Sequence, residues 1–243
     1  EQAGLPQSAL KIVNEIYTLA KRQNNDAQVI KALLYKMIVN DQLSEQGKYE
    51  NVQLLETEIK EAKEPARSIL HSIAGGSYWH YLQLNRWQFY NRTRTPSNVS
   101  DDIATWDIAK LHERINSHFK LSINNSSLLQ NTNLDQYEAI LLKGNARKLR
   151  PTLYDLLAHR ALDYFRNDER YISKPAYSFS INDAAAFSDV KTFTEHEFNT
   201  SDTSSQHYQA LTLYQQLLRF HLNDRDKAAL IDADIHRLKF VHI

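Results

Sequence analysis

The feature that most constrains the fold is a segment, residues 149–165, that is apolar over most of a helical circumference. Its apolar residues form two adjacent rows: Leu153, Leu156, Leu157, Ala161, Tyr164 and Phe165 in one, and Tyr154, Ala158 and Leu162 in the other. Asp155, His159 and Asp163 make the one continuous polar stripe. Thr152 and Asp155 have capping-box spacing, which marks the start of a helix. Because a helix that is apolar on most sides must be covered on several sides, we expect other helices around it.

The composition favours helices and excludes several classes of protein. Five glycines and five prolines among 243 residues are few for a turn-rich β fold. Lysine plus arginine and aspartate plus glutamate both total 29, so no surplus charge points to nucleic acid. The absence of cysteine excludes disulfides, thiol catalysis and cysteine-ligated zinc. A hydrophobic share of 42% is nevertheless enough for a substantial core.

The first part of the chain predicts helical hairpins. Apolar residues recur at helical spacing through four segments, residues 10–20, 26–38, 46–59 and 65–73. Asp26 is the expected cap of the second segment, and Gly75-Gly76 is expected to interrupt the chain after the fourth. Helices of this length with short connectors form antiparallel pairs. We therefore predict an all-α, tetratricopeptide-like α-solenoid or superhelix, with N-terminal hairpins in residues 1–92.

Residues 93–243 are expected to continue the helical array around the helix at 151–166. Its other predicted helices are 103–119, 134–142, 205–221 and 224–242. Residues 170–204 are expected to form an irregular insert. Within it, the alternation from Tyr177 to Ile181 predicts one short extended or β-hairpin element.

No motif for catalysis or cofactor binding is present. The chain has no phosphate-binding glycine loop, and His112 and His118 lie at i, i+6, on separate faces of a helix, where they cannot share a zinc ion. The stripe of Asp155, His159 and Asp163 resembles a carboxylate–histidine relay. Its structural interpretation, pairing with Arg160 or a neighbouring helix, is favoured because ion-pair networks often mimic functional sites. We therefore predict no catalytic, cofactor-binding or metal-binding residues and no enzymatic activity.

An aromatic segment after the glycine pair is the candidate interaction surface. Its rings are Tyr78, Trp79, Tyr81, Trp87, Phe89 and Tyr90. Stacked rings can line a sugar-binding groove, yet helical hairpins also use them as core. The core interpretation is favoured, with Trp79 and Trp87 packed between hairpins.

The run Leu149-Arg150-Pro151-Thr152-Leu153-Tyr154-Asp155-Leu156-Leu157-Ala158-His159-Arg160-Ala161-Leu162 resembles a segment of bacterial alpha-2-macroglobulin family proteins. It is similar to the helical region that precedes the macroglobulin domains in large envelope members. Further stretches fit the same pattern: Ser8 to Tyr35, Ile103 to Asp107, Pro175 to Phe179 and Leu211 to His221.

The resemblance implies an exported protein of Gram-negative bacteria, in the periplasm or at the outer membrane or cell surface, that traps proteases when full-length. Trapping there uses a bait region and, in many members, a Cys-Gly-Glu-Gln thioester, and this chain has neither. We therefore expect a non-catalytic scaffold region of a longer protein, without a cofactor or a transmembrane segment. Its expected partners are the downstream macroglobulin domains and other envelope proteins. The alternative is a helical glycan-binding lipoprotein of the outer-membrane nutrient-uptake type.

Overall fold

The computed structural model describes residues 4–44, 47–90, 102–142, 144, 146–167 and 177–242. Within these ranges every regular element is helical and no strand is present, which confirms the all-α prediction. None of the described helices is long and apolar enough to cross a membrane. Backbone contacts divide the chain into two units, Glu1–Lys143 and Gly144–Ile243, and each has its own core.

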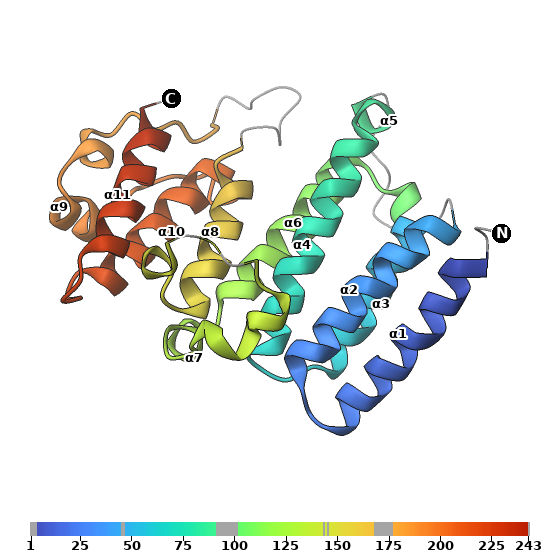
Figure 1. Ribbon diagram of the computed structural model, residues 1–243. Coiled ribbons are helices and arrows are strands. Elements are labelled where there is room, and N and C mark those ends of the chain that lie inside the picture. Colours follow the sequence, from blue (N-terminus) through green and yellow to red (C-terminus); the bar gives the residue numbers. More distant parts are fainter. Residues whose placement is uncertain are drawn as a thin grey trace. The chain divides into compact units, whose positions relative to one another are not determined.

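Unit 1 is a succession of helices in which each of the first four packs on the next (Figure 1). Its elements are α1 (Gly4–Arg22), α2 (Asp26–Leu43), α3 (Gly47–Glu61), α4 (Ala66–Leu84), α5 (Arg86–Tyr90), η1 (Ile103–Thr105), α6 (Ile108–Ile123), α7 (Ser126–Gln130) and η2 (Leu134–Ile140). The most extensive packing in this unit joins α4 to α6. The predicted helix at 134–142 is a 3₁₀ segment, η2, and not an α-helix.

The turn between α1 and α2 differs by one residue from the prediction. Asn24 has a φ of 52°, in the left-handed region that asparagine tolerates. Asn25, and not Asp26, caps α2, because its side chain accepts the Gln28 N–H at 3.1 Å. Asp26 is the first helical residue, where its charge favours the helix N-terminus.

The predicted interruption at Gly75-Gly76 is wrong, since α4 runs without a break from Ala66 to Leu84. A Cβ atom at Gly75 would lie 3.1 Å from the ring of Phe119 on α6. The glycine therefore permits close approach of two helices and does not end one.

The predicted helix at 103–119 is divided into two elements. Asp102 caps the short η1, and Asp107 caps α6 by accepting the Lys110 N–H at 2.7 Å.

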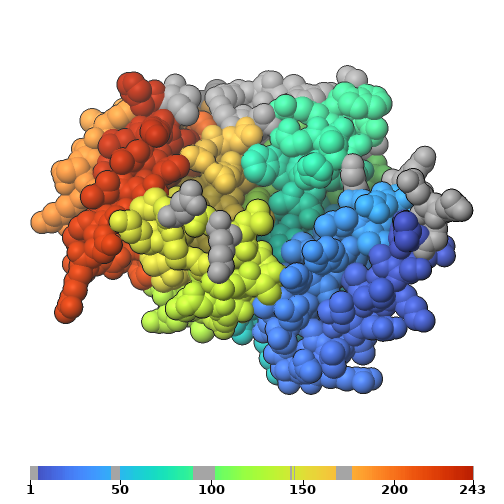
Figure 2. Space-filling view, in the orientation of Figure 1, coloured from blue at the N-terminus to red at the C-terminus, as the bar shows by residue number. Residues whose placement is uncertain are grey.

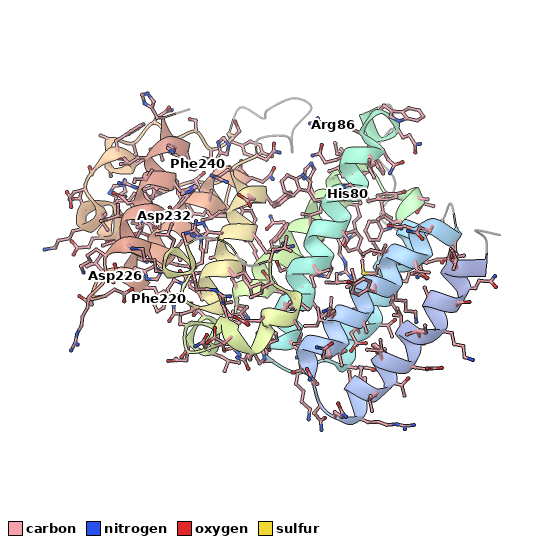
Figure 3. All side chains as sticks on the ribbon, viewed as in Figure 1. His80, Arg86, Phe220, Asp226, Asp232 and Phe240 are labelled. Carbon is pink, nitrogen blue, oxygen red and sulfur yellow. The ribbon has the colours of Figure 1, made fainter. Side chains whose placement is uncertain are left out.

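Unit 2 is organised around three long helices. Its elements are η3 (Arg147–Leu149), α8 (Leu153–Phe165), η4 (Ala184–Phe187), α9 (Val190–Glu195), α10 (Gln206–His221) and α11 (Ala228–Val241). α10 packs on both α8 and α11. Phe240 of α11, labelled in Figure 3, lies against the rings of His207 and Tyr214 of α10, with centroid separations of 5.2 and 6.0 Å.

Helix α8 has the predicted start and the predicted burial. The Thr152 side chain accepts the Asp155 N–H, and the Asp155 carboxylate accepts the Thr152 N–H at 3.0 Å, which completes the capping box. Its buried apolar residues come from both predicted rows: Leu153, Tyr154, Leu157, Ala158, Ala161, Leu162, Tyr164 and Phe165. The expectation that this helix is covered on several sides is therefore confirmed.

The irregular insert is described from residue 177 onward, and side chains of α10 hold it by its backbone. Gln215 donates to the carbonyls of Phe193 and His196, both at 2.7 Å. Arg219 donates to the carbonyl of Thr194. These bonds satisfy carbonyl groups at the end of α9 that have no helical partner.

A buried arginine of α11 attaches the other helical turn of the insert. Arg237 donates to the carbonyl of Ala186 at 2.8 Å, pairs with Asp234 at 2.6 Å and lies over the ring of Phe193. Residues 177–183 form no strand, and the Phe179 N–H donates to the Asp202 carboxylate at 3.3 Å. Residues 170–176 of the predicted insert lie outside the described residues, as does the predicted domain boundary at 92/93.

Candidate functional site

The most concentrated polar cluster of unit 1 surrounds the carboxylate of Glu56 on α3. Its Oε1 atom accepts from Tyr78 of α4 at 2.9 Å, and from Arg114 of α6 through Nη2 at 2.6 Å and Nε at 3.1 Å. His118 of α6 lies 3.0 Å from the same oxygen through Nε2. The Nδ1 atoms of His118 and His71 are also 3.0 Å apart, so one ring donates and the other accepts. Three helices thus converge on one carboxylate.

The cluster keeps Glu56 ionised. Burial by itself raises the pKa of Glu56, but the hydrogen bond and charge of His118 and the charge of Arg114 outweigh burial and lower the pKa to about 2. Burial, followed by the charge of His118, lowers the pKa of His71 to about 4, so His71 is neutral near pH 7. Burial and the Glu56 charge raise the pKa of the Tyr78 hydroxyl, which therefore stays protonated.

Aromatic rings stack beside this carboxylate. Tyr78 lies nearly parallel to Trp106, with an interplanar angle of 13° and a centroid separation of 5.8 Å. Tyr78 also stacks on the ring of His118, with a centroid separation of 5.4 Å. The stack fixes the orientation of the Tyr78 hydroxyl toward Glu56.

A cavity of about 510 Å³ opens next to the cluster, between α3 and α6. The buried side chains of Tyr78, Ile103 and Trp106 form its floor. Exposed residues of the two flanking helices form its rim: Gln53, Thr57 and Lys60 from α3, and Glu113 from α6. This volume is in the range of small-molecule sites.

The geometry of the cluster favours binding over catalysis. A general base needs a pKa near the working pH, and Glu56 is far below it. The Tyr78 hydroxyl donates to Glu56 and is disfavoured as an anion, so it is not an activated nucleophile. In the part of the chain that the structure describes, no three His, Asp or Glu side chains are grouped so as to hold a metal ion.

The structure distributes the predicted aromatic surface over several environments. Tyr78 belongs to the Glu56 cluster, and Phe89, which is 1% exposed, packs edge-on against Tyr81 at 6.0 Å. Trp79 is half-buried. Trp87 is 69% exposed, so the prediction that both tryptophans are packed between hairpins is wrong for Trp87. The Tyr90 side chain lies outside the described residues.

The polar stripe of α8 divides among three separate partners. The Asp155 carboxylate lies 2.6 Å from Nε2 of His221 on α10, besides closing the capping box. Asp163 pairs with Arg166 at 2.5 Å, one turn along the same helix. His159 lies edge-on to the ring of His236 of α11 at 5.9 Å. The three residues do not converge on one reacting atom, which favours the structural interpretation.

The outer side of α1 carries an apolar surface. Four of its residues are exposed and lie on one side of the helix, and together they are called the α1 stripe: Leu5, Ile12, Ile16 and Leu19. The opposite, polar side includes Asn14 and Thr18, which are also exposed. In Figure 2, the dark blue atoms of α1 form part of the outer surface of unit 1. Contiguous exposed apolar residues of this kind mark interaction sites.

Sequence reasoning named Tyr78 and His118 for other roles and missed Glu56, Arg114 and His71, so the cluster itself was not predicted. Glu56 follows the buried Leu55, and His118 follows Leu111 and Ile115 on the buried face of α6. A polar residue on an apolar helical row was the available signal. It predicts a buried polar contact but does not identify the partner.

No protein-family model, curated protein or solved structure matches the chain.

Proposed function

We propose that this chain is a non-catalytic helical scaffold that packs against a protein partner through the α1 stripe. The observation that carries the proposal is the exposure of four large aliphatic residues on one side of α1. Ile12, for example, is 57% exposed. Exposed apolar residues gathered on one side of a helix are typical of an interaction surface. The low pKa of Glu56 makes it a poor general base, which supports a scaffold in preference to an enzyme.

The family proposal rests on the segment from Leu149 to Leu162. It describes the chain as the tetratricopeptide-like N-terminal region of an exported alpha-2-macroglobulin-like protein, in the periplasm or at the cell surface. The partner of the α1 stripe is then another part of the same long polypeptide or another envelope protein. The coding sequence downstream of Ile243 tests this proposal. Repeated β-sandwich patterns support it, and a different architecture would remove the family while leaving the scaffold in place.

Site-specific photocrosslinking tests the scaffold proposal. A benzophenone amino acid replaces Ile16 in the natural full-length protein, and replaces Asn14, on the opposite side of α1, in a matched control. The Ile16 position should give one major crosslinked product, identifiable by peptide mass spectrometry, and the Asn14 position should give little. Equal yields at both positions, or none at either, would contradict a partner on the α1 stripe.

The exposure of Trp87 favours a second candidate function, glycan binding by a lipoprotein of the nutrient-uptake type. A sugar needs an open ring face on which to stack, and Trp87 is the most exposed of the three tryptophans. Oligosaccharides should then shift the tryptophan emission of the parent and of Trp79→Ala, but not of Trp87→Ala. Unchanged emission of the parent across a panel of oligosaccharides would end this candidate.

A further inference from the structure

The cavity between α3 and α6 has cationic groups with unused hydrogen-bonding capacity. Among the described residues none forms an ion pair with Lys60. Arg114 has five N–H donors, of which Nε and Nη2 donate to Glu56, and its side chain also makes a hydrogen bond with Tyr78. The hydroxyl of Ser117, also in the lining, makes no hydrogen bond to another described residue. All three side chains are potential donors to a bound molecule.

The carboxylates of the lining already have partners. Glu113 pairs with Lys110 at 2.9 Å. Glu56 accepts two bonds from Arg114, one from Tyr78 and one contact from His118, all at the same oxygen. Three cationic side chains, Lys60, Lys110 and Arg114, face two anionic ones in the lining, so the cavity has a surplus of positive charge.

The rest of the lining includes apolar side chains. Val52, Ile103 and Trp106 present hydrocarbon and indole surface, and all three are buried. A ligand that fills the cavity therefore meets apolar groups at the floor and cationic donors on the flanking helices. Small-molecule sites typically combine an apolar lining with a few polar groups that fix orientation.

We propose that this cavity binds a small organic anion, with a carboxylate or phosphate group held by Lys60 and Arg114 and an apolar body against Trp106 and Ile103. The site is separate from the α1 stripe and does not depend on the scaffold proposal. Lys60 is exposed at the rim and attracts the anion, whereas Arg114 is held in place by Glu56. Its guanidinium group supplies the fixed half of the anion site.

Amide NMR titration of the 243-residue protein tests the proposal with benzoate, phenyl phosphate, inorganic phosphate and neutral benzyl alcohol. Benzoate or phenyl phosphate should bind saturably, with shifts confined to α3, η1 and α6. The ligand of the two that binds more tightly shows whether the site prefers a carboxylate or a phosphate group. Benzyl alcohol and inorganic phosphate should each bind about tenfold more weakly, since each lacks one half of the recognition.

Two variants localise the anion contact. Lys60→Gln should weaken binding of the preferred anion about tenfold, because a charge-assisted hydrogen bond is lost. Lys63→Gln removes the same charge from an exposed lysine that does not line the cavity, so it should leave affinity unchanged. Ser117→Leu should abolish binding by filling the cavity, with the amide spectrum of the fold retained.

Three results would overturn the proposal. The first is equal binding of benzyl alcohol and the anions, which would make the cavity a purely apolar site. The second is equal weakening by Lys60→Gln and Lys63→Gln, which would show that the loss of affinity comes from the overall charge of the protein and not from a contact in the cavity. The third is the absence of saturable binding by either organic anion.

Discussion

At the scale of single residues, His221 is a buried group of unit 2 that lies between two carboxylates. It is 1% exposed, and both ring nitrogens face carboxylates: Nε2 lies 2.6 Å from Asp155 and Nδ1 lies 2.7 Å from Asp224. Both contacts are hydrogen bonds when the ring carries two protons. Burial alone lowers the pKa of His221, but the hydrogen bonds from the ring to Asp155 and Asp224 outweigh burial and raise it above the ordinary 6.5.

The first prediction concerns stability on the alkaline side. Because the folded protein holds the His221 proton more tightly than the unfolded chain, this contribution is complete below pH 6.5 and is lost as the pH rises through the elevated pKa. His221→Gln should cost about 3–5 kcal/mol at pH 6, since Asp155 then loses its buried cationic partner. The variant should also lose less stability than the parent between pH 6.5 and 9 in urea denaturation. His80→Gln, at an exposed position, is the control and should follow the parent. Parallel curves for His221→Gln and the parent would contradict the assignment.

The second prediction concerns two acid windows in the Glu56 cluster. His71 has a folded pKa of about 4 against 6.5 when unfolded, so the unfolded chain takes up its proton first and stability falls from pH 6.5 to about 4. Glu56 has a folded pKa of about 2 against 4.5, so its contribution is lost between pH 4.5 and 2. His71→Gln should flatten the upper window and Glu56→Gln the lower one, as measured by thermal melts at closely spaced pH values. An unchanged upper window in His71→Gln, or an unchanged lower window in Glu56→Gln, would contradict these assignments.

The sequence predicted the contacts between residues that are close in the chain, but not the contacts between distant residues. The Thr152–Asp155 capping box lies within three residues, and its spacing predicted it correctly. The partner of Asp155 is His221, 66 positions away, and the partner of Glu56 is His118, 62 positions away. No local period connects such residues, because their proximity depends on how helices pack. The candidate cavity could not be predicted for the same reason.

At the scale of elements, the helical period of apolar residues predicted where helices form. The positions of glycine residues were a poorer guide to where helices end. Helix α8 begins and is buried as its pattern indicates. The sequence of Gly75-Gly76 predicts a break because glycine is a poor helix former. Its reason is tertiary instead, since the ring of Phe119 occupies the space that a side chain would need. A single sequence does not distinguish these two uses of glycine.

The third prediction tests whether α8 is central to the core. Leu157 is buried and Leu156, its neighbour, is only half-buried, so the two leucines form a matched pair on one helix. Leu157→Ala should lower the free energy of unfolding by about 2–5 kcal/mol, because it leaves a cavity among side chains that cannot fully collapse. Leu156→Ala should cost clearly less, since part of its surface already contacts water. Equal losses in urea denaturation would argue against the central position of the buried row.

At the scale of the whole molecule, charge and apolar surface act together on association. Positive and negative residues balance at 29 each, and the isoelectric point is about 7.4. Near that pH no net repulsion keeps copies apart. The α1 stripe presents four exposed aliphatic side chains. The isolated chain therefore has an apolar surface and little electrostatic repulsion to oppose association through it.

The last prediction follows from this combination. In low salt, sedimentation velocity should show more self-association at pH 7.4 than at pH 5.5, where histidine protonation gives a net positive charge. Ile12→Glu combined with Ile16→Lys adds an i, i+4 pair that suits a helix and leaves the net charge unchanged. This variant should be monomeric at both pH values with an unchanged melting temperature, because both isoleucines are exposed. Asn14→Glu combined with Thr18→Lys places the same pair on the opposite side of α1 and should associate like the parent. If both pairs reduce association equally, added surface charge is the cause, and the α1 stripe has no special part in the contact.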